Sequence, residues 1–267
     1  MENFNNHTFA ICAYKESSYL EECIKSVINQ EVKSKVIICT ATPNNFIKYM
    51  AKKYKLDLFI RGGEPDIQDD WNFAYKSAST KYVTITHQDD IYSREYSKYV
   101  KRYSNTNKKQ LLFFSDYREL KDGRVIPLTI NLKIKNIMLF PLRFKSLKSK
   151  KTIRKIILSL GSPICCPAVT YNKELISEKP FTSTMKCSLD WDTWYKFSKK
   201  DGQFVYINKD LVYHRIHEES ETTNAIESNV RQSEDYEMFK KFWPKPIAKI
   251  LVKAYCKSLN TNNISNK

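Results

Sequence analysis

The first ninety residues alternate between short apolar runs and longer stretches whose apolar side chains recur at helical spacing. The apolar runs predict buried strands at residues 8–13, 35–40, 57–60 and 82–86. The amphipathic stretches predict helices that start near Ser18, Pro43 and Asp70, and Ser18 with Glu21 predicts a capping box at the first of them. Because each strand is followed by a helix over a short link, we expect an α/β fold with a mostly parallel central sheet covered on both faces.

The pattern is less regular after residue 90. Asp122-Gly123 is a turn dipeptide, and it predicts a hairpin between residues 117–120 and 124–127. The other predicted elements are helices at 94–103, 191–200, 227–242 and 246–257, and strands at 111–115, 163–171, 204–207 and 211–213. The chain after Ser258 is rich in Asn, Ser and Lys, and we expect it to be disordered.

Two adjacent carboxylates, Asp89 and Asp90, close the fourth predicted strand. Asp is a poor strand residue, and two neighbouring acids repel each other unless a cation lies between them. In open α/β sheets, ligands bind beyond the carboxyl ends of the strands, where this pair would lie. The alternative for this stretch alone is a solvated turn or a helix N-cap at Asp90.

Composition excludes several classes of protein. The 267 residues include five glycines, and neither GxGxxG nor GxxxxGK[ST] occurs, which argues against a dinucleotide-binding Rossmann enzyme and a P-loop NTPase. Seven cysteines without a CxxC pair indicate reduced thiols in a cytosolic protein, not a disulfide framework or a zinc site. The N-terminus lacks a signal-peptide pattern, and no apolar run approaches the roughly 20 residues that span a bilayer. We therefore expect a soluble or peripheral protein.

The net charge of +16 is concentrated in the middle of the chain. Residues 98–160 contain 17 Lys or Arg and three acids, and residues 133–160 contain nine basic residues and no acid. Bulky apolar residues alternate with these lysines, which is typical of a helix that lies in the headgroup region of an anionic membrane. The alternatives are a helical lid with a solvated basic face and a nucleic-acid groove.

The order of the motifs is more specific than any one of them. An apolar first strand, strand–helix alternation, Asp89-Asp90, the later Asp190-Trp191-x-x-Trp194 and then Arg215-x-His217 together resemble a family 2 glycosyltransferase of the GT-A fold over residues 7–220. The resemblance implies a GT-A fold with a basic helical C-terminal part. It also implies transfer of a sugar from a nucleotide-sugar, a UDP-sugar by preference, to an acceptor hydroxyl with inversion and with Mn²⁺ or Mg²⁺.

The resemblance also assigns residues to roles. It implies metal ligands at Asp89, Asp90 and His217, although His87 stands where the family often has a further Asp. It implies nucleotide-sugar contacts at Ala13, Tyr14, Glu16, Thr40, Asn72, Asp89 and Arg215. No carboxylate follows the second strand, where the family usually reads uracil with an Asp.

Asp190 matches the catalytic base of the family. A carboxylate at a helix start, flanked by Leu189 and Trp191, can keep a pKa suited to accepting the proton of an acceptor hydroxyl. Leu189 replaces the family's usual acid, and Asp192 is a rival for the same role. The structural alternative is that Asp190 only caps the helix that it begins.

These assignments predict how the chain is divided. We expect a nucleotide-sugar-binding half at 1–127, a basic amphipathic insertion at 128–162, an acceptor-side half at 163–220, C-terminal helices at 221–258 and a disordered tail at 259–267. We expect a carbohydrate or lipid-linked acceptor from surface polysaccharide or glycolipid assembly, and a protein held at the inner face of the cell membrane by its anionic surface. A nucleotidyltransferase lacks support because no Gly-rich loop is present, and a nucleic-acid binder because no aromatic platform is evident.

Overall fold

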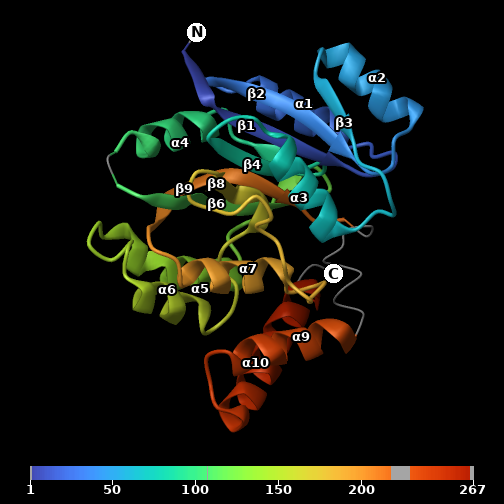
Figure 1. Ribbon diagram of the computed structural model, residues 1–267. Helices are drawn as coiled ribbons and strands as arrows, with labels where there is room; N and C mark the ends of the chain where they lie inside the picture. Colours follow the sequence, from blue (N-terminus) through green and yellow to red (C-terminus); the bar gives the residue numbers. More distant parts are fainter. Residues whose placement is uncertain (1, 107, 218–228, 265–267) are drawn as a thin grey trace.

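The computed structural model describes residues 2–106, 108–217 and 229–264 (Figure 1). The strands are β1 (Asn3–Ala13), β2 (Lys33–Thr40), β3 (Asp57–Ile60), β4 (Tyr82–His87), β5 (Ile91–Tyr92), β6 (Gln110–Lys121), β7 (Arg124–Val125), β8 (Val169–Asn172) and β9 (Gln203–Arg215). The α-helices are α1 (Leu20–Ile28), α2 (Asn45–Tyr54), α3 (Ile67–Ser77), α4 (Tyr96–Ser104), α5 (Ile130–Leu139), α6 (Lys151–Leu158), α7 (Leu189–Ser198), α9 (Asn229–Lys240) and α10 (Lys245–Ile264). Two short 3-10 helices are η1 (Phe140–Arg143) and η2 (Cys166–Ala168).

One central sheet carries the site, in the order β3-β2-β1-β4-β8-β6-β9-β5, with β7 paired to β6. The first four strands in this order are parallel, as the sequence predicts. Beyond β4 the sheet is mixed, because β8 is antiparallel to both β4 and β6, while β6 and β9 are parallel. In the parallel part, Cys12 pairs with His87 and Ala13 with Thr40, so β1, β2 and β4 end at the same edge.

Helices cover both faces of the sheet (Figure 1). Successive side chains of a strand point to opposite faces, so Phe9 and Ile11 belong to one core while Ala10 belongs to the other. Helices α1, α2 and α4 pack on the first core, and α3, α6, α7, α9 and α10 contribute to the second. The predicted α/β fold with a central sheet flanked by helices is therefore confirmed.

Several predicted strands are parts of longer ones. The runs at 111–115 and 117–120 form the single strand β6, and those at 204–207 and 211–213 form β9. The predicted hairpin is present, because Leu120 pairs with Val125 across a turn in which Asp122 (φ 50°) and Gly123 (φ 73°) are both left-handed. The run at 163–171 becomes η2 followed by β8.

The capping box predicted at Ser18 and Glu21 is wrong. Helix α1 starts at Leu20, and no side chain caps its N-terminus. Glu21 turns outward and accepts hydrogen bonds from Lys53 and from the hydroxyl of Tyr54, so tertiary contacts with α2 outweigh the local cap. Caps are present where the sequence analysis did not place them, at Asn44 before α2 and at Asp66 before α3.

The C-terminal part is helical and extends further than the sequence suggests. Helix α10 continues to Ile264, so the disordered tail predicted from residue 259 is wrong up to that point. The first residues of the helix predicted at 227–242, and residues 265–267, lie outside the described part of the chain. No helix among the described residues is long and apolar enough to cross a membrane.

Indole side chains tie the basic segment to the second core. The indole N–H of Trp191 donates to the carbonyl of Leu158 (2.9 Å), and that of Trp243 donates to the carbonyl of Ser159 (2.7 Å). These carbonyls lie at the C-terminal end of α6, where a helix leaves acceptors unpaired. The basic segment is therefore packed on the second core through the C-terminal end of α6.

Candidate active site

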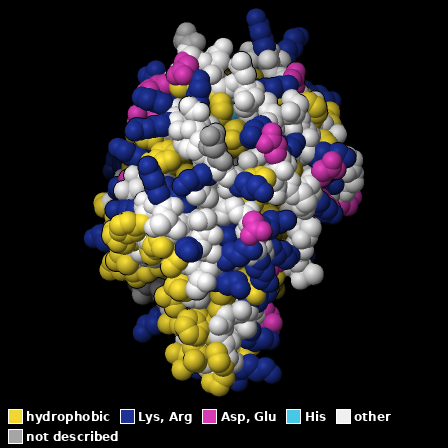
Figure 2. All heavy atoms as spheres, turned by 60° about the vertical axis from the view of Figure 1, so that its left-hand side comes forward, with side chains coloured by type: hydrophobic (Ala, Val, Ile, Leu, Met, Phe, Trp, Pro, Cys, Tyr) yellow, Lys and Arg dark blue, Asp and Glu magenta, His cyan; other side chains and the backbone are white. Residues whose placement is uncertain are grey.

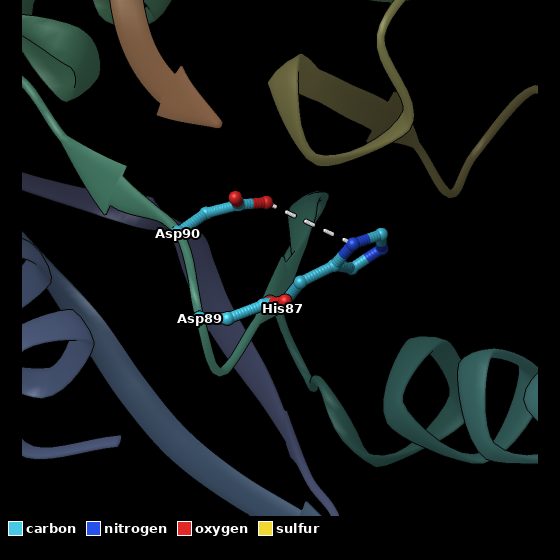
Figure 3. A group of neighbouring side chains, drawn as sticks. All are labelled: His87, Asp89 and Asp90. Carbon is cyan, nitrogen blue, oxygen red and sulfur yellow. Dashed lines mark ion pairs between the residues drawn. The ribbon is translucent and has the colours of Figure 1, made fainter. Parts of the chain in front are cut away.

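The carboxylate pair lies in the turn between β4 and β5. β4 ends at His87, and Asp89 and Asp90 follow immediately. Asp90 is fully buried, and Asp89 is half-buried. Figure 3 shows the carboxylate of Asp90 directed at the ring of His87, with Oδ2 3.8 Å from Nδ1. Two acids and an imidazole thus meet at the carboxyl edge of the parallel strands, where α/β sheets bind ligands.

Strand β9 fixes one oxygen of Asp90. Oδ1 lies 2.9 Å from Nδ1 of His214 and accepts the backbone N–H of Arg215 at 2.9 Å. The antiparallel pairing of β5 with β9 brings these residues together across more than a hundred positions of sequence. Burial lowers the pKa of His214, but the charge and hydrogen bond of Asp90 outweigh it and raise that pKa to about 9. His214 is therefore a cation at neutral pH that partly balances Asp90.

The other oxygen of Asp90, Oδ2, faces the ring of His87. Oδ2 of Asp90 and Nε2 of His87 are both buried, and neither makes a hydrogen bond within the described part of the chain. One donor atom from each of His87, Asp89 and Asp90 lies within 4.8 Å of the others. His87 stacks on Trp71 (ring centroids 5.2 Å apart), and burial lowers its pKa, which leaves a neutral imidazole. Carboxylate oxygens and a neutral imidazole suit Mn²⁺, so the group fits a divalent cation.

The predicted ligand His217 reaches the same group. Its Nε2 lies 3.0 Å from Oδ2 of Asp89, and its ring packs on Tyr19 with the centroids 5.1 Å apart. Burial raises the pKa of Asp89, but the hydrogen bond with His217 and the nearby histidines outweigh it, so the net pKa is lowered. His217 therefore lies beside Asp89, whereas the donor that groups with Asp89 and Asp90 within 4.8 Å is His87, which the sequence analysis treated as a departure.

Arg215 binds the backbone of the carboxylate turn. Its Nε donates to the backbone carbonyl of Asp89 (2.9 Å), its Nη2 donates to Glu22 (2.5 Å), and its guanidinium stacks on Tyr19. The side chain is buried, and these contacts use Nε and Nη2 of the guanidinium. The role that the structure gives Arg215 is to position Asp89; the predicted contact with phosphate stays a prediction.

Asp190 occupies the first turn of α7. Its Oδ1 accepts the backbone N–H of Trp191 (2.6 Å), while the N-cap position belongs to Ser188. Burial raises the pKa of Asp190, and the N–H of Trp191 and the charges of Arg231 and Lys135 offset part of that rise. A carboxylate with a raised pKa is a better proton acceptor than an exposed one, which is the property that a general base requires.

Asp90 and Asp190 both affect the pKa of the Cys165 thiol. Burial is the main reason that the pKa of the Cys165 thiol is raised, and the charges of both Asp90 and Asp190 add to it. Cys165 precedes η2, whose segment passes between the two halves of the chain and contacts β4, β6 and β9. The predicted base and the carboxylate pair therefore lie around one region of the protein although a hundred residues separate them.

Helix α9 holds the loop that leads to Asp190. The carboxylate of Glu234 accepts three backbone N–H groups, those of Lys186 (2.8 Å), Cys187 (2.7 Å) and Ser188 (2.9 Å). Asp235 accepts the hydroxyl of Ser188 at 2.8 Å. These bonds join α9 to the N-terminus of α7 and fix the direction in which α7 begins.

The predicted donor residues on β1 lie beside the carboxylate turn. Ala13 is buried at the end of β1 and is followed by Tyr14. The side-chain amide of Gln88 accepts the N–H of Tyr14 (2.9 Å) and donates to its carbonyl (3.0 Å). The β1 end is thus bound to the turn that carries Asp89, which brings the predicted donor and metal residues together.

The remaining donor residues are spread over two turns. Thr40 is buried, and its hydroxyl accepts the N–H of Thr42 (3.0 Å), while Thr42 in turn accepts the N–H of Lys15 (2.7 Å). Glu16 is exposed on the loop after β1. The ends of β1 and β2 therefore form one connected edge.

Asn72 has a structural role that the sequence analysis gave only as an alternative. Its amide donates to the carbonyl of Phe181 (2.8 Å) and accepts the N–H of the same residue (3.1 Å). Both polar ends of this buried side chain hold the segment before α7 against α3. The predicted contact of Asn72 with the donor stays a prediction.

Comparison with known families decides the assignment. The family model for glycosyl transferase family 2 matches residues 8–178, more than half of the chain. The chain belongs to glycosyl transferase family 2. The matched region of this glycosyltransferase contains the second half of β1, all of β2–β8 and both carboxylates of the turn, and the resemblance stated from the motifs is confirmed. A comparison with curated protein sequences finds no match.

Solved structures show the same fold. Residues 1–349 of Staphylococcus aureus TarS, in complex with UDP-GlcNAc, align with a TM-score of 0.60 and 15% identity over 94% of this glycosyltransferase and 70% of that chain. The mannosyltransferase PcManGT from Pyrobaculum calidifontis, in complex with GDP-Man and Mn²⁺, gives 0.60 and 13% over 95% and 70%. Mycobacterium tuberculosis glucosyl-3-phosphoglycerate synthase, with Mn²⁺ and UDP-Glc, gives 0.53 and 13% over 86% and 77%.

Four residues of this glycosyltransferase's site escaped the sequence analysis. Gln88 and His87 stand inside the motif; the pairing of β1 with β4 brings Gln88 to Tyr14, and His87 reaches Asp90 within the turn itself. Glu22 and Glu234 come from helices whose pattern indicates only solvent-exposed acids. Their partners lie far away in sequence, so no local signal identifies them.

Proposed function

We propose that this glycosyltransferase moves a sugar from a nucleoside diphosphate-sugar, a UDP-sugar by preference, to an acceptor hydroxyl, with inversion and with a divalent metal. The observation that carries the proposal is the carboxylate turn, where Oδ2 of buried Asp90 lies beside His87 and Asp89 without a hydrogen bond to any residue that the structure describes. The bound UDP-GlcNAc, GDP-Man and UDP-Glc of the structural neighbours support a nucleotide-sugar donor.

Mn²⁺ or Mg²⁺ would be held by His87, Asp89 and Asp90, with His217 beside Asp89. Such a cation supplies positive charge that stabilises the diphosphate as it leaves. The Mn²⁺ and Mg²⁺ in neighbouring structures support this assignment. Arg215 and His214 keep the two carboxylates in place through the backbone of Asp89 and Oδ1 of Asp90.

Asp190 is the proposed base. Its carboxylate accepts the proton of the acceptor hydroxyl as that oxygen attacks the anomeric carbon, and the bond to the diphosphate breaks on the opposite side. One displacement with one base inverts the anomeric carbon, and no nucleophile of the protein is needed. Glu234 and Asp235 hold the start of α7, so the base keeps its direction during the reaction. We further propose a carbohydrate or lipid-linked acceptor of surface polysaccharide or glycolipid assembly.

Binding and turnover test the proposal together. Thermal unfolding is measured with a panel of UDP- and GDP-sugars, with and without Mn²⁺, because a ligand that binds only the native state raises the unfolding temperature. We expect a rise with one donor that depends on Mn²⁺ and is lost in Asp90→Asn. Donor hydrolysis or transfer should also be lost in that variant.

Two results would contradict the proposed function. Wild-type turnover in Asp90→Asn would remove the role of the carboxylate turn. Release of pyrophosphate from a nucleoside triphosphate and a sugar phosphate, without any transfer from nucleotide-sugars, would instead identify a nucleotidyltransferase.

A further inference from the structure

Helix α5 has apolar side chains on two opposite sides. Leu132 and Leu139 point inward and are buried. Ile130, Ile134 and Ile137 recur at i, i+4 and i+7, so they share the opposite side of the helix, and they are 73%, 49% and 72% exposed. A surface helix of a water-soluble domain normally carries polar residues on that side. The outward apolar row of α5 therefore lacks an explanation within the fold.

The same kind of surface continues on neighbouring segments. Phe140 and Phe144 lie edge to face (5.5 Å between centroids), and both are about half exposed. On α10, Ile247 and Ile250 are 42% and 69% exposed. Helices α5 and α10 pack on the same core, which contains Leu139 of α5 and Ala248 and Val252 of α10. Figure 2 shows apolar side chains gathered at the level of α5 and α6 and again below them, at the level of α10.

Cations surround these apolar side chains. Residues 128–162 contain nine Lys or Arg and no acid, and residues 245–264 contain four Lys and no acid. Lys133 of α5 and Lys249 of α10 are exposed next to the apolar rows, and the guanidinium of Arg143 lies over the ring of Phe140. Lys and Arg are visible around the apolar areas in Figure 2. Long basic side chains at the border of an apolar surface can reach lipid phosphates while their stems cover hydrocarbon.

We propose that this α5–α10 surface, formed by Ile130, Ile134, Ile137, Phe140, Ile247 and Ile250, docks on an anionic phospholipid bilayer. The apolar rows enter the boundary between headgroups and acyl chains, and the surrounding lysines bind the anionic headgroups. The distribution of charge and apolar side chains favours a membrane over two other partners, a second copy of the chain and nucleic acid. A second copy of the chain would bring the same cluster of cations against itself, and nucleic acid would leave the exposed aliphatic side chains without an apolar partner. The proposal does not depend on the reaction that the active site catalyses.

Vesicle co-sedimentation of the full chain tests the proposal. We expect binding to phosphatidylcholine vesicles that contain about 30% phosphatidylglycerol, at least tenfold weaker binding to pure phosphatidylcholine, and weaker binding when salt rises from about 0.1 M to about 0.5 M. The double variant Ile137→Ser, Ile250→Ser should lower the partition coefficient by about 10- to 100-fold, because two large aliphatic side chains no longer leave water. Both side chains are mostly exposed, so the fold does not depend on them.

A matched control tests whether vesicle binding depends on the α5–α10 surface or on exposed apolar side chains anywhere on the protein. Tyr49→Ser, Ile60→Ser removes two side chains of similar exposure (58% and 50%) from α2 and β3, and it should bind vesicles like the wild type. As an independent measurement, a tryptophan placed by Phe140→Trp should be quenched by brominated lipids. A tryptophan placed by Tyr49→Trp should not.

Four results would overturn the proposal. These are equal binding to neutral and anionic vesicles, no binding to either, wild-type binding by the Ile137→Ser, Ile250→Ser variant, and absence of quenching at position 140. A dimer in solution that this variant dissociates would assign the surface to a second copy instead. Binding to DNA that the variant abolishes would likewise assign it to nucleic acid.

Discussion

Among single residues, Asp190 gives the sharpest test of the chemistry. Burial raises its pKa, so the carboxylate takes up a proton at a higher pH than an exposed aspartate does. Asp190→Asn keeps the shape and the bond to the N–H of Trp191 but cannot accept a proton, and we expect kcat to fall by on the order of 100- to 10,000-fold with little change in the KM for the donor. In the wild type, kcat should fall as pH decreases through this raised pKa, and steady-state kinetics between pH 4 and 8 measure it.

Asp192 serves as the control for that substitution. It was the rival base in the sequence, but it is almost fully buried and pairs with Lys196 (2.8 Å) and Lys241 (2.5 Å). Burial raises its pKa, and the bonds to the two lysines more than offset this, so the net pKa is lowered and the group is a poor base. Asp192→Asn should lower stability by about 1–3 kcal/mol while kcat stays within a few-fold. Comparable losses of kcat in both variants would remove the distinction.

The residues that sequence patterns identified are those that stand in contiguous motifs. Asp89, Asp90 and Asp190 are recognisable because acids end a strand or begin a helix at set places in the order of elements. The partners that define their chemistry, such as His214 and Glu234, are 124 and 44 positions away along the chain. Long-range pairing of β5 with β9 and packing of α9 on α7 create those contacts, and neither has a local signature.

At the level of elements, α9 fixes the start of α7 through hydrogen bonds from Glu234. Glu234→Gln replaces one of the two carboxylate oxygens that accept the N–H groups of Lys186, Cys187 and Ser188, so at least one bond to a charged acceptor is lost. Such a bond contributes about 1.5–3 kcal/mol. Because the start of α7 directs Asp190, we expect kcat to fall by about tenfold, while the Mn²⁺-dependent thermal shift with donor is retained. Steady-state kinetics and thermal unfolding measure the two effects.

Glu237→Gln is the matched control on the same helix. Glu237 pairs with Lys240 at the surface (2.7 Å), an exposed pair that contributes little to stability. We expect wild-type kcat and unfolding temperature for this variant. A loss of donor binding in Glu234→Gln, or equal effects of the two substitutions on kcat, would contradict a positioning role for Glu234.

Elements were predicted well where periodicity is strong and poorly where their ends depend on neighbours. The alternation in residues 8–86 gave four strands in the right places. Helix starts were shifted because caps at Asn44 and Asp66 precede the first apolar positions, and because Glu21 bonds to α2 instead of its own helix. Strands β6 and β9 are continuous through polar stretches, since each is paired along its length with the other.

For the whole molecule, the parallel half of the sheet followed from the sequence, and the mixed half did not. Strand β8 lies between β4 and β6 although more than forty residues separate it from either, and its four residues carry no sign of that position. The basic insertion was expected either as a lid or as a membrane element. In the structure it packs on the core through α6 while α5 presents an apolar row outward, so one segment has both properties.

Acid stability of the whole domain should depend on His7. This fully buried residue lies between the hydroxyls of Ser34 and Thr84 (2.9 Å each), and burial lowers its pKa to about 3, whereas an unfolded histidine titrates near 6.5. Between pH 6.5 and about pH 3, His7 is therefore protonated in the unfolded state but not in the folded state. The stability of the fold falls as pH decreases through this range. Linkage gives a loss of about 2 kcal/mol between pH 7 and pH 5.

The comparison with His7→Gln isolates this effect, because every other titrating group is common to both proteins. Asp116, for example, works in the opposite direction: burial raises its pKa to about 6, so the folded state gains stability as this carboxyl takes up its proton below that pH. Urea unfolding at pH 7 and pH 5 should show that the wild type loses about 2 kcal/mol more than His7→Gln over this interval. Equal losses in the two proteins would mean that His7 is protonated in the fold, in which case its ring would have to donate to both Ser34 and Thr84.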